Sequence, residues 1–413
     1  MILRKNLLKV SFILLAVLLP IVFNSSINAT IEERDYLVSY ESYQDKVVSI
    51  NQNDIMDRVK EDYKSFDMIK ISLTNEEAKE LREEDGVIVV PDIPIRLHSD
   101  QITWSNEMME APLAWDSDLT GKNVKVAVLD SGIADHTDLV VAGRLDLTDG
   151  LGTANDSLGH GTAVSGIIAA RKNDNGLVGI SPDVELYAVK VIGNDGVGSL
   201  STAMSAIDWS MTNKMDIINL SFGVDYTGLT ELEKTYVMDM INSKGNNALN
   251  QNLLIVSSAG NDGNSTGLDN ISAPARGDGF IAVGAVDSNK TLATFSSIGP
   301  SLDVVAPGVG IQTLGLNNTY VSGNGTSFSA PHIAGLAALY MEKYPNMGAR
   351  AIRDMIIENA EDLGTVGFDN YFGNGLSYFN PDVEEVIVPI PTVNDMMNGQ
   401  TIVTGSTHQM QGF

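Results

Sequence analysis

The sequence predicts an α/β fold over residues 100–381, in which helices cover both faces of a mainly parallel sheet. Two observations support this prediction. Short apolar runs rich in Val and Ile recur along the region, and helix-like stretches such as 200–213 and 231–244 lie between several of them. Apolar strands that alternate with helices are typical of a buried parallel sheet, whose functional groups gather beyond the carboxyl ends of its strands. The runs cover 124–129, 186–191, 217–220, 253–256 and 281–286.

A small α+β domain is expected to precede this fold, over residues 30–99. The region is rich in Asp, Glu and Lys, with strand-like pieces at 36–38, 68–73 and 87–90 and a helix-like segment at 75–84. Thr74 and Glu77 have the spacing of a capping box, which predicts the start of that helix. Pro91, Pro94 and the polar residues 98–101 then predict an exposed linker.

The charge balance and the lack of cysteine exclude several classes of function. The 413-residue chain has 26 Lys and Arg against 53 Asp and Glu, a formal net charge of −27. Such a field repels phosphate backbones, so we expect no nucleic-acid partner. A chain without cysteine has no thiol nucleophile, thiolate metal site or disulfide, and no His-Glu-x-x-His zinc motif is present either. We expect a monomer.

The two ends of the chain differ from the rest. Arg4, Lys5 and Lys9 precede an apolar run at 10–23, and small residues at 24–29 follow it. The run is shorter than the roughly 20 residues of a spanning helix, so we interpret residues 1–29 as a signal peptide, cleaved after Ala29, rather than as a membrane anchor. This interpretation predicts a secreted, extracellular, bacterial protein. Residues 382–413 form a proline-containing tail whose role the sequence does not reveal.

Four residues beside glycines are candidates for catalysis. Asp130 follows an apolar strand, His160 and Ser327 lie at predicted helix starts, and Asn261 follows the strand at 253–256. Each has a common structural explanation when taken alone. An Asp or Ser at such a place is more often a helix cap or turn, an Asn is often a left-handed turn, and a His is often a surface residue.

The order of these residues and the motifs around them change this interpretation, because the chain resembles the subtilisin family of serine proteases. The resemblance covers residues 101–381 and rests on Val-Ala-Val-Leu-Asp-Ser-Gly at 126–132, His-Gly-Thr at 160–162 and Gly-Thr-Ser-Phe-Ser-Ala-Pro-His at 325–332. Ile-Asn-Leu-Ser-Phe-Gly at 218–223 and Ala-Gly-Asn at 259–261 match two further family segments.

The resemblance implies a serine endopeptidase that works through an acyl-enzyme. Ser327 is the expected nucleophile, His160 the base that takes its proton, and Asp130 the group that orients the imidazole. Asn261 and the Ser327 N–H are expected to hold the oxyanion. Alternatives are a dedicated processing peptidase for one bacterial peptide or exoprotein, and a catalytically silent binding scaffold. An esterase is disfavoured, because the Gly-x-Ser-x-Gly elbow is absent.

The family's substrate segments can also be placed. Two edge segments are expected to bind an extended peptide by β-augmentation, and a roomy primary pocket is expected to take large apolar side chains and to tolerate basic ones. Leu200, Ala203 and Phe222 are expected to line a second apolar pocket, although ordinary core packing remains an alternative. The edge segments contain Gly196, Val197, Gly198, Ser221, Phe222 and Gly223, and the primary pocket also Ala259, Gly260, Asp262 and Ser272.

Calcium and a propeptide are two further implications of the resemblance. The loop 172–176 resembles a calcium-binding loop, with Gln101, Asp138, Asn173 and Asp174 as expected oxygen ligands; a solvated turn is the alternative. The domain at 30–99 resembles a propeptide that the enzyme removes near residues 98–101. A retained adhesive or dimerising domain is the alternative.

Two departures from the family pattern stand beside the expected triad. Phe328 directly follows the nucleophile, where many relatives have Met, and Ala163 stands where relatives often have a second His. Because a Phe ring has no oxidisable sulfur, we expect the enzyme to resist peroxide.

Overall fold

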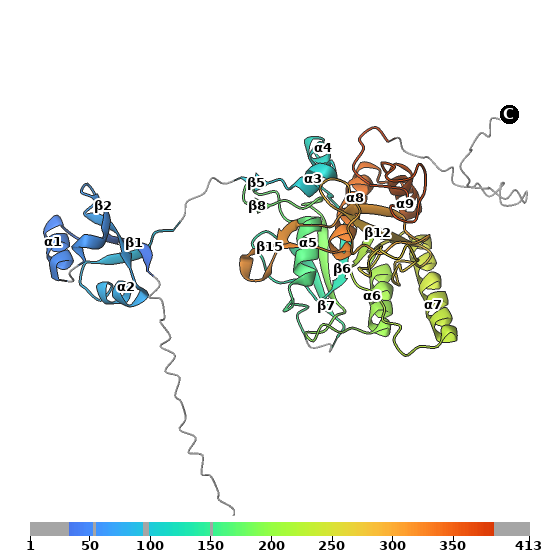
Figure 1. The fold of residues 1–413 in the computed structure, drawn as a ribbon, viewed down its shortest axis with the longest axis horizontal. Helices are drawn as coiled ribbons and strands as arrows, with labels where there is room; N and C mark the ends of the chain where they lie inside the picture. The colour runs from blue at the N-terminus through green and yellow to red at the C-terminus, as the bar shows by residue number, and fades with distance from the viewer. Residues whose placement is uncertain (1–32, 53–54, 94–98, 149–151, 384–413) are drawn as a thin grey trace, which may run out of the picture. The chain divides into compact units, whose positions relative to one another are not determined.

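The computed structural model describes residues 33–52, 55–93, 99–148 and 152–383 (Figure 1). The expected signal peptide and nearly all of the C-terminal tail lie outside these residues. The chain divides into two compact units, 1–97 and 98–413. No helix in the described part of the chain is long and apolar enough to cross a membrane.

The N-terminal unit is a small α+β domain with an antiparallel sheet in the order β2-β3-β1-β4. The strand-like pieces correspond to β1, β3 and β4, and the predicted helix is α2, which ends at Leu81 rather than at residue 84. Thr74 and Glu77 form the capping box that their spacing predicts. Its elements are β1 (Arg34–Ser39), α1 (Tyr43–Gln52), η1 (Met56–Arg58), β2 (Val59–Tyr63), β3 (Met68–Leu73), α2 (Asn75–Leu81) and β4 (Ile88–Pro91).

The second unit contains a sheet of seven parallel strands among its described residues, in the order β13-β12-β11-β10-β6-β9-β7. This confirms the predicted fold class. The strands are β6 (Lys125–Asp130), β7 (Val141–Asp146), β9 (Glu185–Lys190), β10 (Ile217–Leu220), β11 (Leu254–Ser258), β12 (Phe280–Val286) and β13 (Val304–Pro307).

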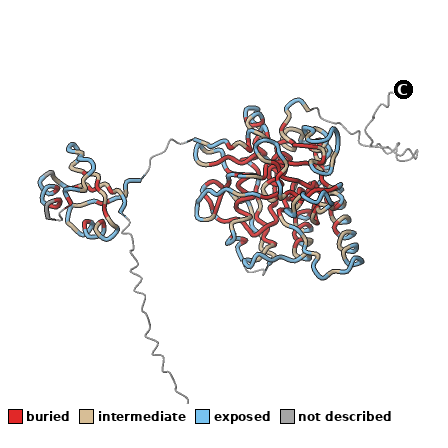
Figure 2. The backbone as a smooth tube through the Cα atoms, viewed as in Figure 1, coloured by how far each residue is buried: buried red, intermediate tan, exposed pale blue. Residues whose placement is uncertain are grey.

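Helices pack on both faces of this sheet (Figure 1). Alternate residues of β6 explain why: Val126 and Val128 belong to the core under α5 and α8, whereas Ala127 and Leu129 belong to the core under α6 and α7. Figure 2 shows buried chain through the middle of this unit and more exposed chain along α7. The helices are α3 (Trp104–Met108), α4 (Ala111–Asp116), α5 (His160–Ala169), α6 (Leu200–Thr212), α7 (Glu231–Asn250), α8 (Thr326–Lys343) and α9 (Ala349–Glu358), with η2 (Leu316–Asn318).

The interpretation of residues 98–101 as linker is wrong in part. Asp100–Gln101 form the short strand β5, which pairs in parallel with β8 (Gly176–Leu177). Two residues give too short a pattern to recognise in the sequence, and only pairing with residues 76 positions later makes them a strand. The hairpin β14 (Ile311–Leu314) and β15 (Tyr320–Gly323) was likewise not expected.

Candidate active site

Asp130 and His160 meet where strand β6 ends and helix α5 begins. Asp130 is the last residue of β6 and is 2% exposed, and His160 is the first residue of α5. The Nδ1 atom of His160 lies 2.8 Å from Oδ1 and 2.9 Å from Oδ2 of Asp130. Because a carboxylate only accepts, Nδ1 carries the proton and donates it, so Nε2 presents a lone pair.

The surroundings of His160 make it a stronger base. Burial of the ring lowers its pKa, but the charge and hydrogen bond of Asp130 and the charge of Asp156 outweigh burial and raise the pKa above its ordinary value. The other histidine of the region, His332 on α8, is fully buried, and burial lowers its pKa to about 4. His332 is therefore neutral at ordinary pH, with Nδ1 2.7 Å from the carbonyl oxygen of Phe328.

Ser327 is the second residue of α8, at the positive end of the helix dipole. Its hydroxyl donates to the carbonyl oxygen of Ser221 at 3.2 Å, and the Ser221 hydroxyl donates to the Ser327 carbonyl at 2.9 Å. Ser221 follows β10, so this pair ties the helix to the carboxyl end of a strand. The ring of Phe328 lies edge-on to His160, with centroids 6.4 Å apart. Within the described residues, no hydrogen bond joins Ser327 Oγ to His160 Nε2.

Asn261 faces the start of the same helix. Its side-chain oxygen accepts from the N–H of Thr326 at 2.9 Å and from the Thr326 hydroxyl at 3.1 Å. This fixes the orientation of the amide. A β-carbon placed on Gly325 would lie 3.7 Å from Asn261 Nδ2 and 3.7 Å from the N atom of Ser327. Two N–H groups therefore border one small space, which stays open because residue 325 is a glycine.

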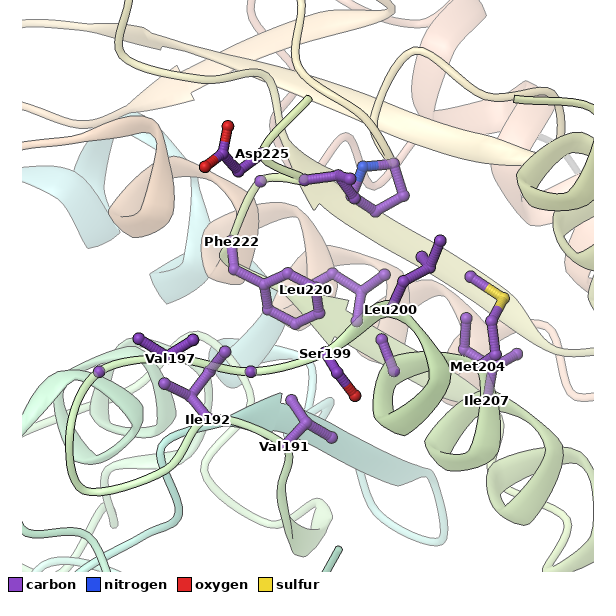
Figure 3. A pocket seen from close by; sticks show the side chains of 16 residues that line it. Val191, Ile192, Val197, Ser199, Leu200, Met204, Ile207, Leu220, Phe222 and Asp225 are labelled. Carbon is purple, nitrogen blue, oxygen red and sulfur yellow. The ribbon is translucent and has the colours of Figure 1, made fainter. Parts of the chain in front are cut away.

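A cavity of about 450 Å³ lies beside α6 and is lined mainly by apolar groups (Figure 3). Leu200, Ala203 and Phe222, the residues expected at a second apolar pocket, all line this cavity. Asp225 is at its edge, and Figure 3 shows the carboxylate pointing away from the labelled apolar side chains. The remaining lining residues are Val191, Ile192, Gly196, Val197, Gly198, Ser199, Met204, Ile207, Leu220, Gly223, Val224 and Pro274.

Several residues expected to form the primary pocket lie around Ser272. A β-carbon on Gly260 would lie 2.3 Å from Ser272 Oγ, and one on Gly223 would lie 3.4 Å from Ser272 Cβ. Both glycines therefore border this side chain. Ala259 is buried behind them, and Asp262 is exposed.

The expected calcium ligands are only partly brought together. The Nδ2 atom of Asn173 donates to Asp138 Oδ1 at 3.2 Å, while Gln101 and Asp174 are exposed. Asp100, which the sequence analysis did not select, accepts at Oδ1 from the N–H groups of Asn173 and Asn175, at 3.0 and 3.2 Å. Carboxylate and amide oxygens are the ligands that calcium prefers, so the side chains of this loop are chemically suited to bind the ion. Among the described residues, no three acidic or histidine side chains form a metal cluster.

One buried acid beside Asp130 and His160 was missed by sequence reasoning. Asp156 is 3% exposed and accepts hydrogen bonds from both sides of the Asp130–His160 pair. Its place four residues before His160, in a loop just ahead of a helix, is the signal that could have found it.

Comparison with known proteins places this architecture in a family. The model of the subtilase family matches residues 121–375. An alkaline protease of Alkalihalobacillus alcalophilus is 35% identical over 377 residues, which are 87% of this chain and 95% of that protein. Subtilisin DY of Bacillus licheniformis is 43% identical over 257 residues, 62% of this chain and 89% of that protein.

A solved structure matches the fold of this chain as well. The crystal structure of MycP1 with its N-terminal propeptide removed superposes with a TM-score of 0.58 at 27% identity, over 67% of this chain and 94% of that one. The match in family model, sequence and fold covers the sheet and the helices that carry Asp130, His160 and Ser327. The chain belongs to the subtilase family and is a subtilisin-like serine endopeptidase.

Proposed function

We propose that Asp130, His160 and Ser327 form the catalytic triad of this endopeptidase. The observation that carries the proposal is the contact of His160 Nδ1 with both oxygens of a buried carboxylate. It fixes the tautomer in which Nε2 accepts a proton. In the reacting state the Ser327 hydroxyl leaves Ser221 and donates to Nε2 instead. His160 then takes the proton as Ser327 attacks the peptide carbonyl, and Asp130 stabilises the imidazolium.

The space beside Gly325 is the proposed oxyanion site. As the tetrahedral intermediate forms, its negative oxygen accepts from Asn261 Nδ2 and from the N–H of Ser327. Collapse of this intermediate breaks the peptide bond, and the imidazolium gives its proton to the leaving amine. Water then repeats the sequence on the acyl-enzyme, with His160 again as the base, and releases the acid product.

We propose that substrates bind as extended peptides between the segments 196–198 and 221–223. Gly198 already makes an antiparallel bridge with Ile192, so its segment has strand geometry. One substrate side chain enters the pocket at Ser272, and another enters the apolar cavity beside α6. Backbone pairing gives affinity, and the two pockets give selectivity.

Export, self-maturation and a bound calcium ion complete the proposal. A relative from Bacillus subtilis is named minor extracellular protease Epr, and the solved relative had an N-terminal propeptide, which supports a secreted zymogen here. The N-terminal unit has its own core, as a folding chaperone requires. Calcium would be held at the loop 172–176 by Asp138, Asn173 and backbone oxygens, where it would stabilise the fold.

The intact mass of the secreted product tests this function. Wild type is compared with Ser327→Ala, and Ser329→Ala, two residues along the same helix, serves as the matched control. We expect wild type and the control to lack about the first hundred residues, and Ser327→Ala to keep the N-terminal unit. Equal trimming of all three would refute self-maturation, and full casein hydrolysis by Ser327→Ala would refute the triad.

A further inference from the structure

Asp156 is a buried carboxylate whose two oxygens are saturated with donors. Oδ1 accepts from the hydroxyl of Ser131 and from the N–H groups of Leu158 and Gly159, each at 2.9 Å. Oδ2 accepts from the N–H of Thr162 at 2.9 Å and from its hydroxyl at 2.7 Å. Five donors on one side chain hold the loop, the start of α5 and the residue after β6 together.

Ser131 is the junction between this carboxylate and Asp130. Its N–H donates to Asp130 Oδ1 at 2.7 Å, and its hydroxyl, which donates to Asp156, accepts from the N–H of Gly161 at 3.0 Å. Its carbonyl accepts from the buried ammonium of Lys190 on β9. Hydrogen bonds therefore run without a break from Asp130 through Ser131 to Asp156 and the helix start.

The strand end and the helix start also approach each other closely. A β-carbon on Gly161 would lie 2.1 Å from the carbonyl oxygen of Gly132 and 3.2 Å from Cβ of Asp130. The end of β6 and the start of α5 are therefore packed too closely to admit even a methyl group between them. Any shift of the helix start would change the contact between Asp130 and His160.

We propose that Asp156 is a positioning residue of the active site. Acting through Ser131 and the first turn of α5, it holds Asp130 and His160 in contact, and its negative charge stabilises the imidazolium that forms when His160 takes a proton. This inference rests on the proposed triad, and it adds a second buried carboxylate to the one that touches the imidazole.

The charged groups around His160 support the electrostatic part. Asp130 contacts the ring, the Asp156 charge acts from the α5 side, and Lys190 lies beyond Ser131 on β9. Burial lowers the pKa of His160, and the two carboxylates raise it. Removing the charge of Asp156 lowers this pKa, so His160 stays a neutral base to lower pH.

Two variants separate position from charge. Asp156→Asn keeps the shape of the side chain and an oxygen toward Ser131, but it removes the charge and the acceptor for the N–H of Thr162. Its acidic limb in a plot of kcat/KM against pH is expected to move to lower pH. Ser131→Ala keeps the charge but breaks the bridge. Its acidic limb is expected to stay in place while kcat/KM on the plateau falls roughly tenfold to hundredfold, as small misplacements of catalytic groups cost.

The controls make each outcome decisive. Asp239→Asn, on the exposed side of α7, changes the net charge equally and is expected to leave the profile unchanged. If Asp156→Asn does not fold, Asp156→Ser, which keeps a capping oxygen, carries the same expectation. An acidic limb of the folded variant that coincides with that of Asp239→Asn overturns the charge role, and an unchanged plateau in Ser131→Ala overturns the positioning role. If either role of Asp156 is overturned while Ser327→Ala is inactive, only the inference about Asp156 fails and the proposed triad is still supported.

Discussion

Filling the cavity beside α6 is expected to change which peptides are cut. Ala203 lines this cavity from the helix, and Ala203→Leu would place a larger apolar side chain where the substrate side chain is proposed to lie. Leu is a good helix former, so α6 should tolerate it. The substitution therefore tests the pocket without touching the triad.

The size of the effect follows from the apolar lining. A buried aromatic side chain covers about 150–250 Å², which at ~25 cal/mol per Å² corresponds to about 4–6 kcal/mol when burial is complete. The cavity is open on one side, so we take about half, ~2–3 kcal/mol. Wild type should then prefer Phe to Ala at this substrate position by about 30- to 150-fold in kcat/KM.

The assay uses peptides of one length in which a single Phe is moved along an alanine-rich sequence. One position should show the preference in wild type, and Ala203→Leu should reduce it at least tenfold at that position only. Ser205→Leu adds the same bulk on the exposed side of α6 and serves as the control. The reasoning is refuted if no position shows a preference, or if Ala203→Leu and Ser205→Leu behave alike.

Three further outcomes are expected. Asn261→Ala should lower kcat by about 10- to 150-fold with little change in KM, because it loses one hydrogen bond to a charged group that exists only in the transition state. A loss of affinity for a substrate analogue as large as the loss in kcat would contradict this role. Wild type should keep its activity in dilute peroxide and Phe328→Met should lose it, as timed inactivation will show. A chelator should lower the melting temperature of the mature enzyme, and added calcium but not magnesium should restore it; an unchanged melting temperature would remove the proposed ion.

The strands and helices of the second unit could be predicted because their signals are local. Runs of Val and Ile are long enough to identify strands, and the glycines beside His160 and Ser327 mark the helix starts. The short strand β5 could not be predicted, because its two residues are defined only by pairing with Gly176–Leu177. Asp100, whose Oδ1 accepts from the N–H groups of Asn173 and Asn175, was missed for the same reason, and Gln101 as a calcium ligand stays a prediction.

The site shows a similar division. Motifs in one order were enough to select Asp130, His160, Ser327 and Asn261, since each motif carries its residue at a strand end or helix start. Asp156 was missed because it has no motif of its own. The role of its side chain depends on Ser131, 25 residues earlier in the sequence, and on other hydrogen-bond donors that face it only in the folded chain. Sequence patterns identify groups that react, whereas the groups that hold them are identified by contacts.

The N-terminal unit should lose stability in acid because of one carboxylate. Glu77 accepts from the N–H and hydroxyl of Thr74 and pairs with Arg58 through two hydrogen bonds, at 2.7 and 3.0 Å. The bond to Arg58, together with those from Thr74, lowers the pKa of Glu77 from 4.5 to about 2, against the effect of burial. A lowered pKa contributes stability above the unfolded value, and this contribution is lost as the pH falls from 4.5 toward 2. Hydrogen exchange of the uncut Ser327→Ala chain should therefore show weaker protection of this unit across that range. In the same background Glu77→Gln should flatten the dependence, whereas Glu76→Gln, its exposed neighbour, should keep it. If the two variants show the same dependence, the pair with Arg58 does not stabilise the unit.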